Sequence, residues 1–81
     1  MKSDEELLQR IVINPKVMGG KPIVKGTRIT VEQVLKLMAQ GLTPEDILRD
    51  FPHLKKDDLA AALLYASKLT GDEEIYPVTI T

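Results

Sequence analysis

Side chains that could carry out chemistry are few in this sequence. His53 is the single histidine, cysteine is absent, and acids cluster at Asp57-Asp58 and at residues 72–74. Nucleophilic catalysis needs a nucleophile beside a general base, and zinc sites are built from several His or Cys ligands. Neighbouring acids on a helix point about 100° apart, so they do not readily share a metal ion. We therefore expect no enzyme, no metal site and no cofactor, and a turn-packing role for His53.

The stretch MGGKPIVKGTRIT, residues 18–30, is the next candidate because it combines three glycines with three cations. A P-loop has two glycines separated by four residues, then Lys and Ser or Thr at a helix start. Here five residues separate Gly20 from Gly26, and β-prone residues follow. A β-hairpin with glycine turns is the better interpretation. The glycines predicted at turns or at a helix end are Gly19, Gly20, Gly26 and Gly41.

Charge is distributed unevenly although the net charge is only −1. Residues 7–31 hold five basic side chains and no acid, whereas residues 32–81 hold nine acids and five bases. A basic segment suits an anionic partner, either DNA or an acidic protein surface. Chance scatter, and an internal ion-pairing role for Arg28, are the alternatives. The candidate nucleic-acid or partner-binding residues are Lys21, Lys25, Arg28, Lys55 and Lys56.

The elements that must position these residues begin with a short helix and strands. Capping-box spacing predicts a helix over residues 4–9, and β-prone segments predict strands near residues 10–14, 22–24 and 27–30. A chain of 81 residues holds one domain. We expect residues 1–30 to form its N-terminal helix and hairpin segment.

Three helices are predicted after Thr30, of roughly nine, seven and fourteen residues. Thr43-Pro44 marks the second start, and the third begins near Lys55 or Lys56. The predicted fold class is therefore mainly α, a trihelical bundle over residues 31–70 with a short N-terminal β-hairpin and an extended tail over residues 71–81. The link at residues 51–55 resembles the turn of a helix-turn-helix.

The last predicted helix is apolar around most of its circumference. We expect an inner stripe of Leu59, Ala62, Leu63 and Ala66. A helix that is apolar all round is buried on more than one side, so the second side is expected to meet a second copy of the chain. The alternative is one wide core stripe with half-exposed flanks. The candidate dimer-interface residues, including two from the β-prone tail, are Ala61, Leu64, Tyr65, Ile75 and Tyr76.

Residues 13–66 resemble the domain-of-unknown-function family 433 (DUF 433). The matching motif residues are Gly20-Lys21-Pro22, Gly26-Thr27-Arg28, Gly41 and Pro52-His53-Leu54, with the AALLYA run. The resemblance implies a homeodomain-like or winged-helix-like trihelical fold and an antitoxin encoded beside a PIN-like nuclease toxin. Lys55 departs from the Thr or Ser common in the family. Since Lys cannot accept a hydrogen bond, the helix cap is predicted to be weaker by ~1 kcal/mol.

Two classes of function stay open at this point. The first is an antitoxin-like binding module, a homodimer that binds a nuclease toxin and its own promoter DNA. The alternative is a stand-alone DNA-binding transcriptional regulator, or a dimeric scaffold that binds no DNA. No small-molecule substrate is evident, and no apolar run reaches the ~18 residues of a membrane span. We expect a cytoplasmic protein.

Overall fold

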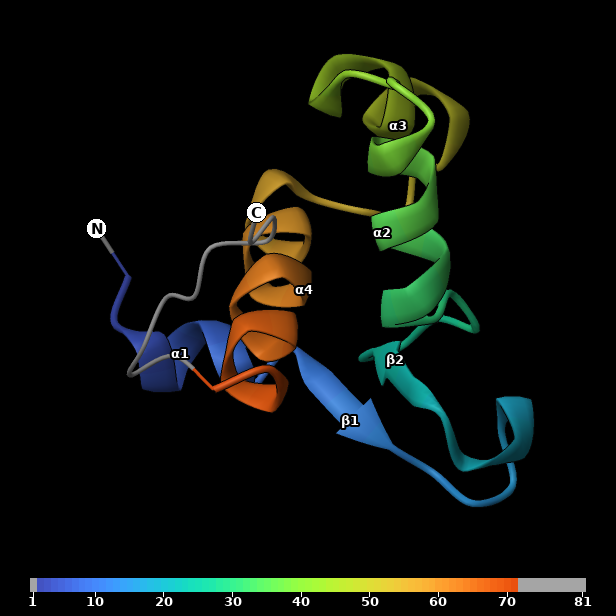
Figure 1. The fold of residues 1–81 in the computed structure, drawn as a ribbon. Coiled ribbons are helices and arrows are strands. Elements are labelled where there is room, and N and C mark those ends of the chain that lie inside the picture. Colours follow the sequence, from blue (N-terminus) through green and yellow to red (C-terminus); the bar gives the residue numbers. More distant parts are fainter. Residues whose placement is uncertain (1, 72–81) are drawn as a thin grey trace, which may run out of the picture.

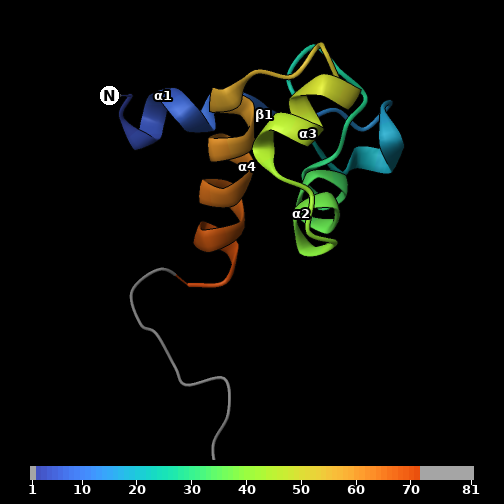
Figure 2. The ribbon, with the colours of Figure 1, turned by 90° about the horizontal axis from the view of Figure 1, so that it is seen from above.

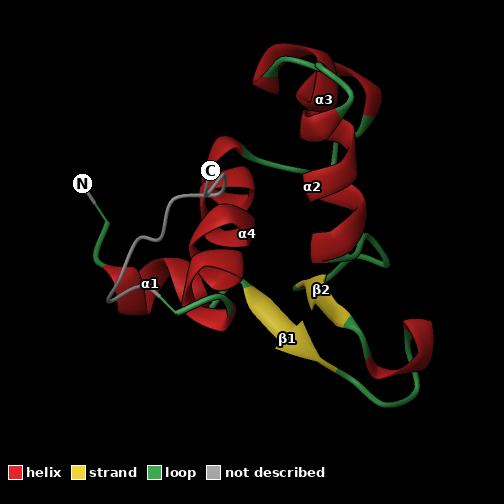
Figure 3. Cartoon of the chain, in the orientation of Figure 1, coloured by secondary structure: helices red, strands yellow, loops and turns green. Residues whose placement is uncertain are grey.

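The computed structural model describes residues 2–71, which form four α-helices and a two-stranded antiparallel sheet (Figure 1 and Figure 3). The predicted lengths of the last three helices, nine, seven and fourteen residues, are confirmed. The helices are α1 (Asp4–Leu8), α2 (Val31–Ala39), α3 (Pro44–Asp50) and α4 (Lys56–Leu69). The strands are β1 (Ile11–Ile13) and β2 (Pro22–Val24), with a 3₁₀ segment, η1 (Met18–Gly20), between them.

The two strands pair with Ile11 opposite Val24 and Ile13 opposite Pro22. The third strand predicted at residues 27–30 is wrong, because this segment contributes a single bridge between Ile23 and Thr30. The hydroxyl of Thr27 donates to the Val24 carbonyl at 2.8 Å and accepts from the Ile29 N–H at 3.0 Å. These bonds fold the chain after Val24 into a turn, so residues 27–29 add no strand to the sheet.

Side-chain caps fix where the helices begin. The Thr30 hydroxyl accepts from the Gln33 N–H at 2.9 Å at the start of α2. At the start of α3, Thr43 and Asp46 form a reciprocal capping box, with both bonds at 3.1 Å. Each cap satisfies backbone N–H groups that have no partner inside the helix. Gly41, with φ 95°, then turns the chain out of α2 into α3.

The core lies where α2, α3 and α4 meet beside β2. Val34 and Ile47 are fully buried at its centre, and burying each stabilises the fold by roughly 1.5–3 kcal/mol. Leu63 is 52 % exposed, so its placement on the inner stripe of α4 is wrong. The predictions for Leu59 and Ala62 on the same stripe are confirmed, since both belong to the buried cluster. The buried cluster consists of Val24, Val31, Val34, Ile47, Leu54, Leu59 and Ala62.

The second apolar side of α4 lies against α1 of the same chain, as two perpendicular views show (Figure 1 and Figure 2). Residues three or four apart share one side of a helix, and on this side they are Asp57, Ala61, Leu64 and Lys68. Asp57 lies 3.7 Å from the Lys2 ammonium, and Lys68 lies 4.0 Å from Asp4. Ala61, between them, has no exposed surface. The prediction that Ala61 contacts a second copy is therefore wrong, because α1 already covers it.

Candidate functional site

The N-terminus of α4 is tied to the end of α1 and the start of β1 by one arginine. Arg10 Nη1 lies 3.0 Å from Asp58 Oδ1, and Nη2 lies 3.4 Å from Asp57 Oδ2. The second oxygen of Asp58 accepts the Lys55 N–H at 2.8 Å. Asp58 therefore forms one half of a capping box, the bond to the backbone N–H of Lys55, and its own charge is matched by Arg10. Asp57 also lies 3.7 Å from the Lys2 ammonium, so two cations face the two aspartates, which by themselves would repel phosphate.

Four of the predicted cations, Lys25, Arg28, Lys55 and Lys56, are exposed around this end of α4. The Lys25 N–H donates to the Arg10 carbonyl at 2.7 Å, which places the β2 turn beside the aspartate-binding arginine. Arg28 and His53 line one small hollow of about 250 Å³, and Lys55 follows His53 by two residues. We call these four cations the basic end. Within residues 2–71, no carboxylate forms an ion pair with any of the four side chains.

Lys21 lies apart from the basic end. Its ammonium is 3.0 Å from Glu32 Oε1, and Lys36 approaches the other oxygen of Glu32 at 3.9 Å. The hydrogen bond from Lys21, followed by the positive charges of Lys21 and Lys36, lowers the pKa of Glu32 below its ordinary value of 4.5. Lys21 is thus held by an acid at the rim of a different hollow.

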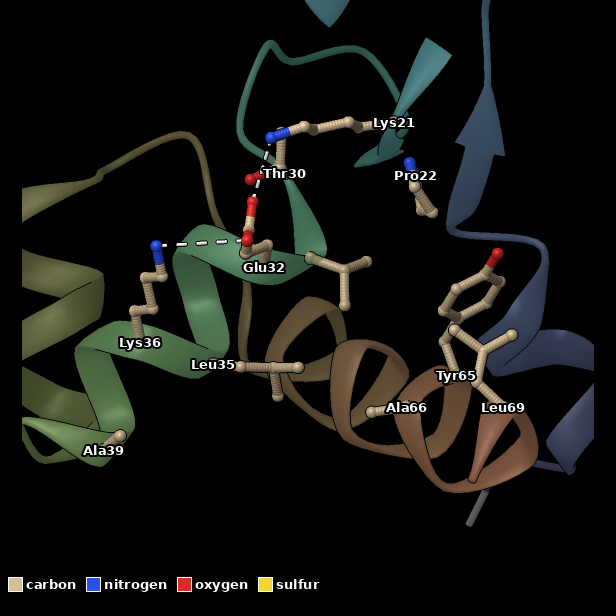
Figure 4. A pocket seen from close by; sticks show the side chains of 11 residues that line it. Lys21, Pro22, Thr30, Glu32, Leu35, Lys36, Ala39, Tyr65, Ala66 and Leu69 are labelled. Atoms are coloured by element: carbon tan, nitrogen blue, oxygen red, sulfur yellow. Dashed lines mark hydrogen bonds and ion pairs between the residues drawn. The ribbon is translucent and has the colours of Figure 1, made fainter. Parts of the chain in front are cut away.

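That hollow is an apolar groove between α2 and α4, with a volume of about 540 Å³ (Figure 4). Leu35 and Ala39 of α2 face Ala66 and Leu69 of α4 across it, and Tyr65 stands at one side. The groove was missed at the level of sequence. Its signal is weak, since apolar residues spaced by three or four are equally typical of a filled core.

The predicted interface residues fall into three environments. Ala61 is buried under α1, Leu64 is half-buried on the same side of α4, and Tyr65 packs against the core and lines the groove. Ile75 and Tyr76 lie outside the described residues. Before the last turn of α4, Leu63 is the large apolar side chain that is more than half exposed.

Among the described residues, no three His, Asp or Glu side chains are close enough to hold a metal ion. The described helices include none with both the length and the apolar character needed to cross a membrane. His53 is exposed next to Arg28 rather than packed in the turn that precedes α4.

The fold is that of a small, mainly helical protein. A short β-hairpin packs on a helical bundle, and the turn after β2 carries Lys25, Gly26 and Arg28. The family described as "Protein of unknown function (DUF433)" matches residues 11–66. The chain belongs to this family, which confirms the resemblance noted from the sequence.

The chain is also similar to a solved structure of a member of this family and to two uncharacterized proteins. A crystal structure of a DUF433 member from Anabaena variabilis ATCC 29413 superposes with a TM-score of 0.72 at 33 % identity, over 79 % of this chain and 63 % of that one. The uncharacterized protein y4eO of Sinorhizobium fredii (strain NBRC 101917 / NGR234) is 34 % identical over 82 % of this chain and 31 % of its own length. An uncharacterized Archaeoglobus fulgidus protein is 47 % identical over 37 % of this chain and 83 % of its own. The chain thus spans about a third of the Sinorhizobium protein.

Proposed function

We propose that this protein is an antitoxin-like binding module without catalytic activity, and that its basic end contacts the phosphate backbone of DNA. The observation that supports the proposal is the basic end itself, four exposed cations with no carboxylate partner among residues 2–71. Phosphate contacts from Lys and Arg provide most of the affinity of non-specific DNA binding. Arg10 and Lys2 together bring two positive charges to the two nearby aspartates, so these aspartates oppose such contacts little.

The proposed contact is blind to DNA sequence. The order of α3, the link and α4 suits a homeodomain-like or winged-helix-like bundle, in which the last helix would face the major groove. The exposed face of α4 presents Lys56, Ala60, Leu63 and Ser67. Lys56, at the first helical position, is the one side chain on this face that commonly reads base edges, and the face lacks Arg, Asn and Gln. Binding is therefore proposed to rest on the backbone, which positions a protein without specifying sequence.

A matched pair of charge reversals tests the basic end. Arg28→Glu combined with Lys56→Glu changes two of its cations, and Lys16→Glu combined with Lys36→Glu makes the same change in net charge elsewhere. We expect the first variant to bind duplex DNA about tenfold more weakly or worse, and the second to stay close to wild type. Equal losses in both variants would show that binding follows net charge alone, and unchanged binding in the first would remove the basic end from the proposal.

The protein partner in the proposal is a PIN-like nuclease toxin, and this pairing rests on the family resemblance. Fold and family analogy is a weak warrant for function, so the pairing needs a direct test. Co-expression with the product of the neighbouring reading frame, purified by a tag on that product, is expected to retain this chain. Loss of the chain in the first wash would favour the stand-alone DNA-binding regulator. A cytoplasmic location follows from either proposal.

A homodimer stays a prediction within this proposal, with its interface moved to the part of the exposed face of α4 that surrounds Leu63 and leaves Lys56 free. Leu63 is the large apolar side chain on that face, and a second copy would double the number of phosphate contacts. Leu63→Glu is expected to give the sedimentation mass of one chain with unchanged helical content. A dimer mass in this variant would remove the face as the interface.

A further inference from the structure

The groove between α2 and α4 leaves apolar side chains uncovered. Leu69, at one end of the groove, is 70 % exposed, and Leu35, Ala39 and Ala66 line its walls (Figure 4). At about 540 Å³ the groove falls in the size range of ligand pockets. A hollow of this kind accepts a few side chains of an extended segment.

The chain leaves α4 directly beside this groove. Ala66 and Leu69 belong to the last turn of α4 and also line the groove. The Thr70 N–H donates to the Ala66 carbonyl at 3.1 Å, and Gly71, with φ 83°, turns the chain out of the helix. The part of the chain that the structure describes therefore ends at Gly71, two residues after a side chain that lines the groove.

The sequence that follows has the composition to enter the groove. Residues 72–81 read DEEIYPVTIT, three acids followed by a β-prone apolar segment. In an extended segment Tyr76, Val78 and Ile80 alternate with small polar residues and Pro77, so they fall on one face. Seven extended residues reach about 23 Å, whereas nine helical residues, the length of α2, span about 13.5 Å. Residues 75–81 are long enough to follow the groove.

Charge also favours this occupant. The rim of the groove carries Lys21 and Lys36, which share the single carboxylate of Glu32 (Figure 4). Two ammonium groups face one carboxylate, so Lys21, Lys36 and Glu32 together carry one net positive charge. The acids at residues 72–74 come directly before the apolar segment, so they reach the rim when that segment enters the groove.

We infer that the groove between α2 and α4 is a docking site for residues 75–81 of the same chain. A segment tethered next to its site experiences an effective concentration in the millimolar range, which a second copy does not match in dilute solution. A stable contact between subunits also buries roughly 800 Å² per partner, more than a groove of pocket size offers. The docked segment shields the exposed side chain of Leu69 and closes the apolar side of the α2–α4 pair.

Methyl NOE spectroscopy on the full chain tests the inference. We expect NOEs from the methyl groups of Val78 and Ile80 to those of Leu35 and Leu69. A mixture of isotope-labelled and unlabelled chains separates contacts within one chain from contacts between chains. Absence of these NOEs would overturn the inference, and NOEs between chains would overturn it in favour of a second copy.

A pair of substitutions at the end of α2 provides a second measurement. Ala39 is exposed and lines the groove, whereas the neighbouring Gln40 is exposed and does not line it. Ala39→Glu places a bulky carboxylate in the groove, and we expect the NOEs from Val78 and Ile80 to be lost. Gln40→Glu adds the same charge outside the groove and should keep them. Retention in both variants would contradict docking at this site.

Discussion

Arg10 and Asp58 lie 48 positions apart in the sequence, and their side chains form a 3.0 Å ion pair that joins the start of the hairpin to the N-terminus of α4. Asp58 is only 5 % exposed, and its second oxygen caps α4 through the Lys55 N–H. The pair therefore orients the helix that carries Lys55 and Lys56 relative to the turn that carries Lys25. The geometry of the basic end depends on this contact.

Removal of the arginine charge is predicted to destabilise the fold. In Arg10→Met the aliphatic stem stays, but the largely buried Asp58 carboxylate loses its cation. We expect the free energy of unfolding in urea to fall by about 1–3 kcal/mol, the usual cost of leaving a buried polar group unmatched. Asp57→Asn, at the more exposed end of the same arginine, should cost less than about 1 kcal/mol. Equal effects of the two substitutions would mean that burial of Asp58 is not what makes the pair important.

Local features of this fold were predictable from sequence, because caps and periodicity are local. Thr30 and Thr43 mark the starts of α2 and α3, Gly41 marks the end of α2, and all three predicted helix lengths match. Strand pairing beyond the hairpin was over-predicted at residues 27–30. There the bonds of Thr27 to its own neighbours compete with the ladder, and β-propensity does not describe that competition.

Contacts between distant segments were not predictable. The apolar character of Ala61 and Leu64 correctly indicated a second covered side of α4, but the sequence does not say what covers it. A five-residue helix at the other end of the chain does so. The ion pair of Lys21 likewise depends on where Glu32 lies in space, whereas Arg28 has no carboxylate partner within residues 2–71.

Packing of α1 against α4 predicts opposite outcomes for two neighbouring alanines. Ala61 is fully buried, so Ala61→Leu forces extra atoms into a filled space and should cost about 1–3 kcal/mol. Ala60 is exposed, so Ala60→Leu should change stability by no more than about 0.5 kcal/mol. Thermal unfolding followed by circular dichroism measures both. If Ala61→Leu is as stable as wild type, α1 does not cover this side of α4.

The turn that presents Lys25 and Arg28 requires a left-handed residue. Gly26 has φ 80°, and an added Cβ would meet no atom within 4 Å, so the cost of substitution is conformational. Gly26→Ala is expected to lose about 1–2 kcal/mol of stability. Gly26→Asn should lose less, because Asn tolerates this conformation better. Chemical denaturation measures both values, and an equal loss would point to a steric cause instead.

The capping box of α3 predicts part of the acid sensitivity of the protein. The hydrogen bond from the Thr43 backbone N–H, followed by that of the Thr43 hydroxyl, lowers the pKa of Asp46 below its ordinary value of 3.8. A pKa lowered by folding stabilises the fold fully above the ordinary value, and this stabilisation is lost as pH falls through the folded pKa. Asp46→Asn should therefore flatten the loss of stability below about pH 4, whereas Glu45→Gln, one position earlier, should retain it. Urea unfolding at a series of pH values makes the comparison, and identical profiles for the two variants would contradict it.

The salt dependence of DNA binding tests the proposed role of the basic end most directly. Four phosphate contacts predict a slope of log affinity against log salt of about −3 to −4 for each bound chain. Arg28→Glu combined with Lys56→Glu should make the slope about two units shallower, since each lost phosphate contact removes about one unit. The Lys16→Glu and Lys36→Glu control should keep the wild-type slope. A wild-type slope near zero, or an unchanged slope in the Arg28 and Lys56 variant, would contradict binding through this surface.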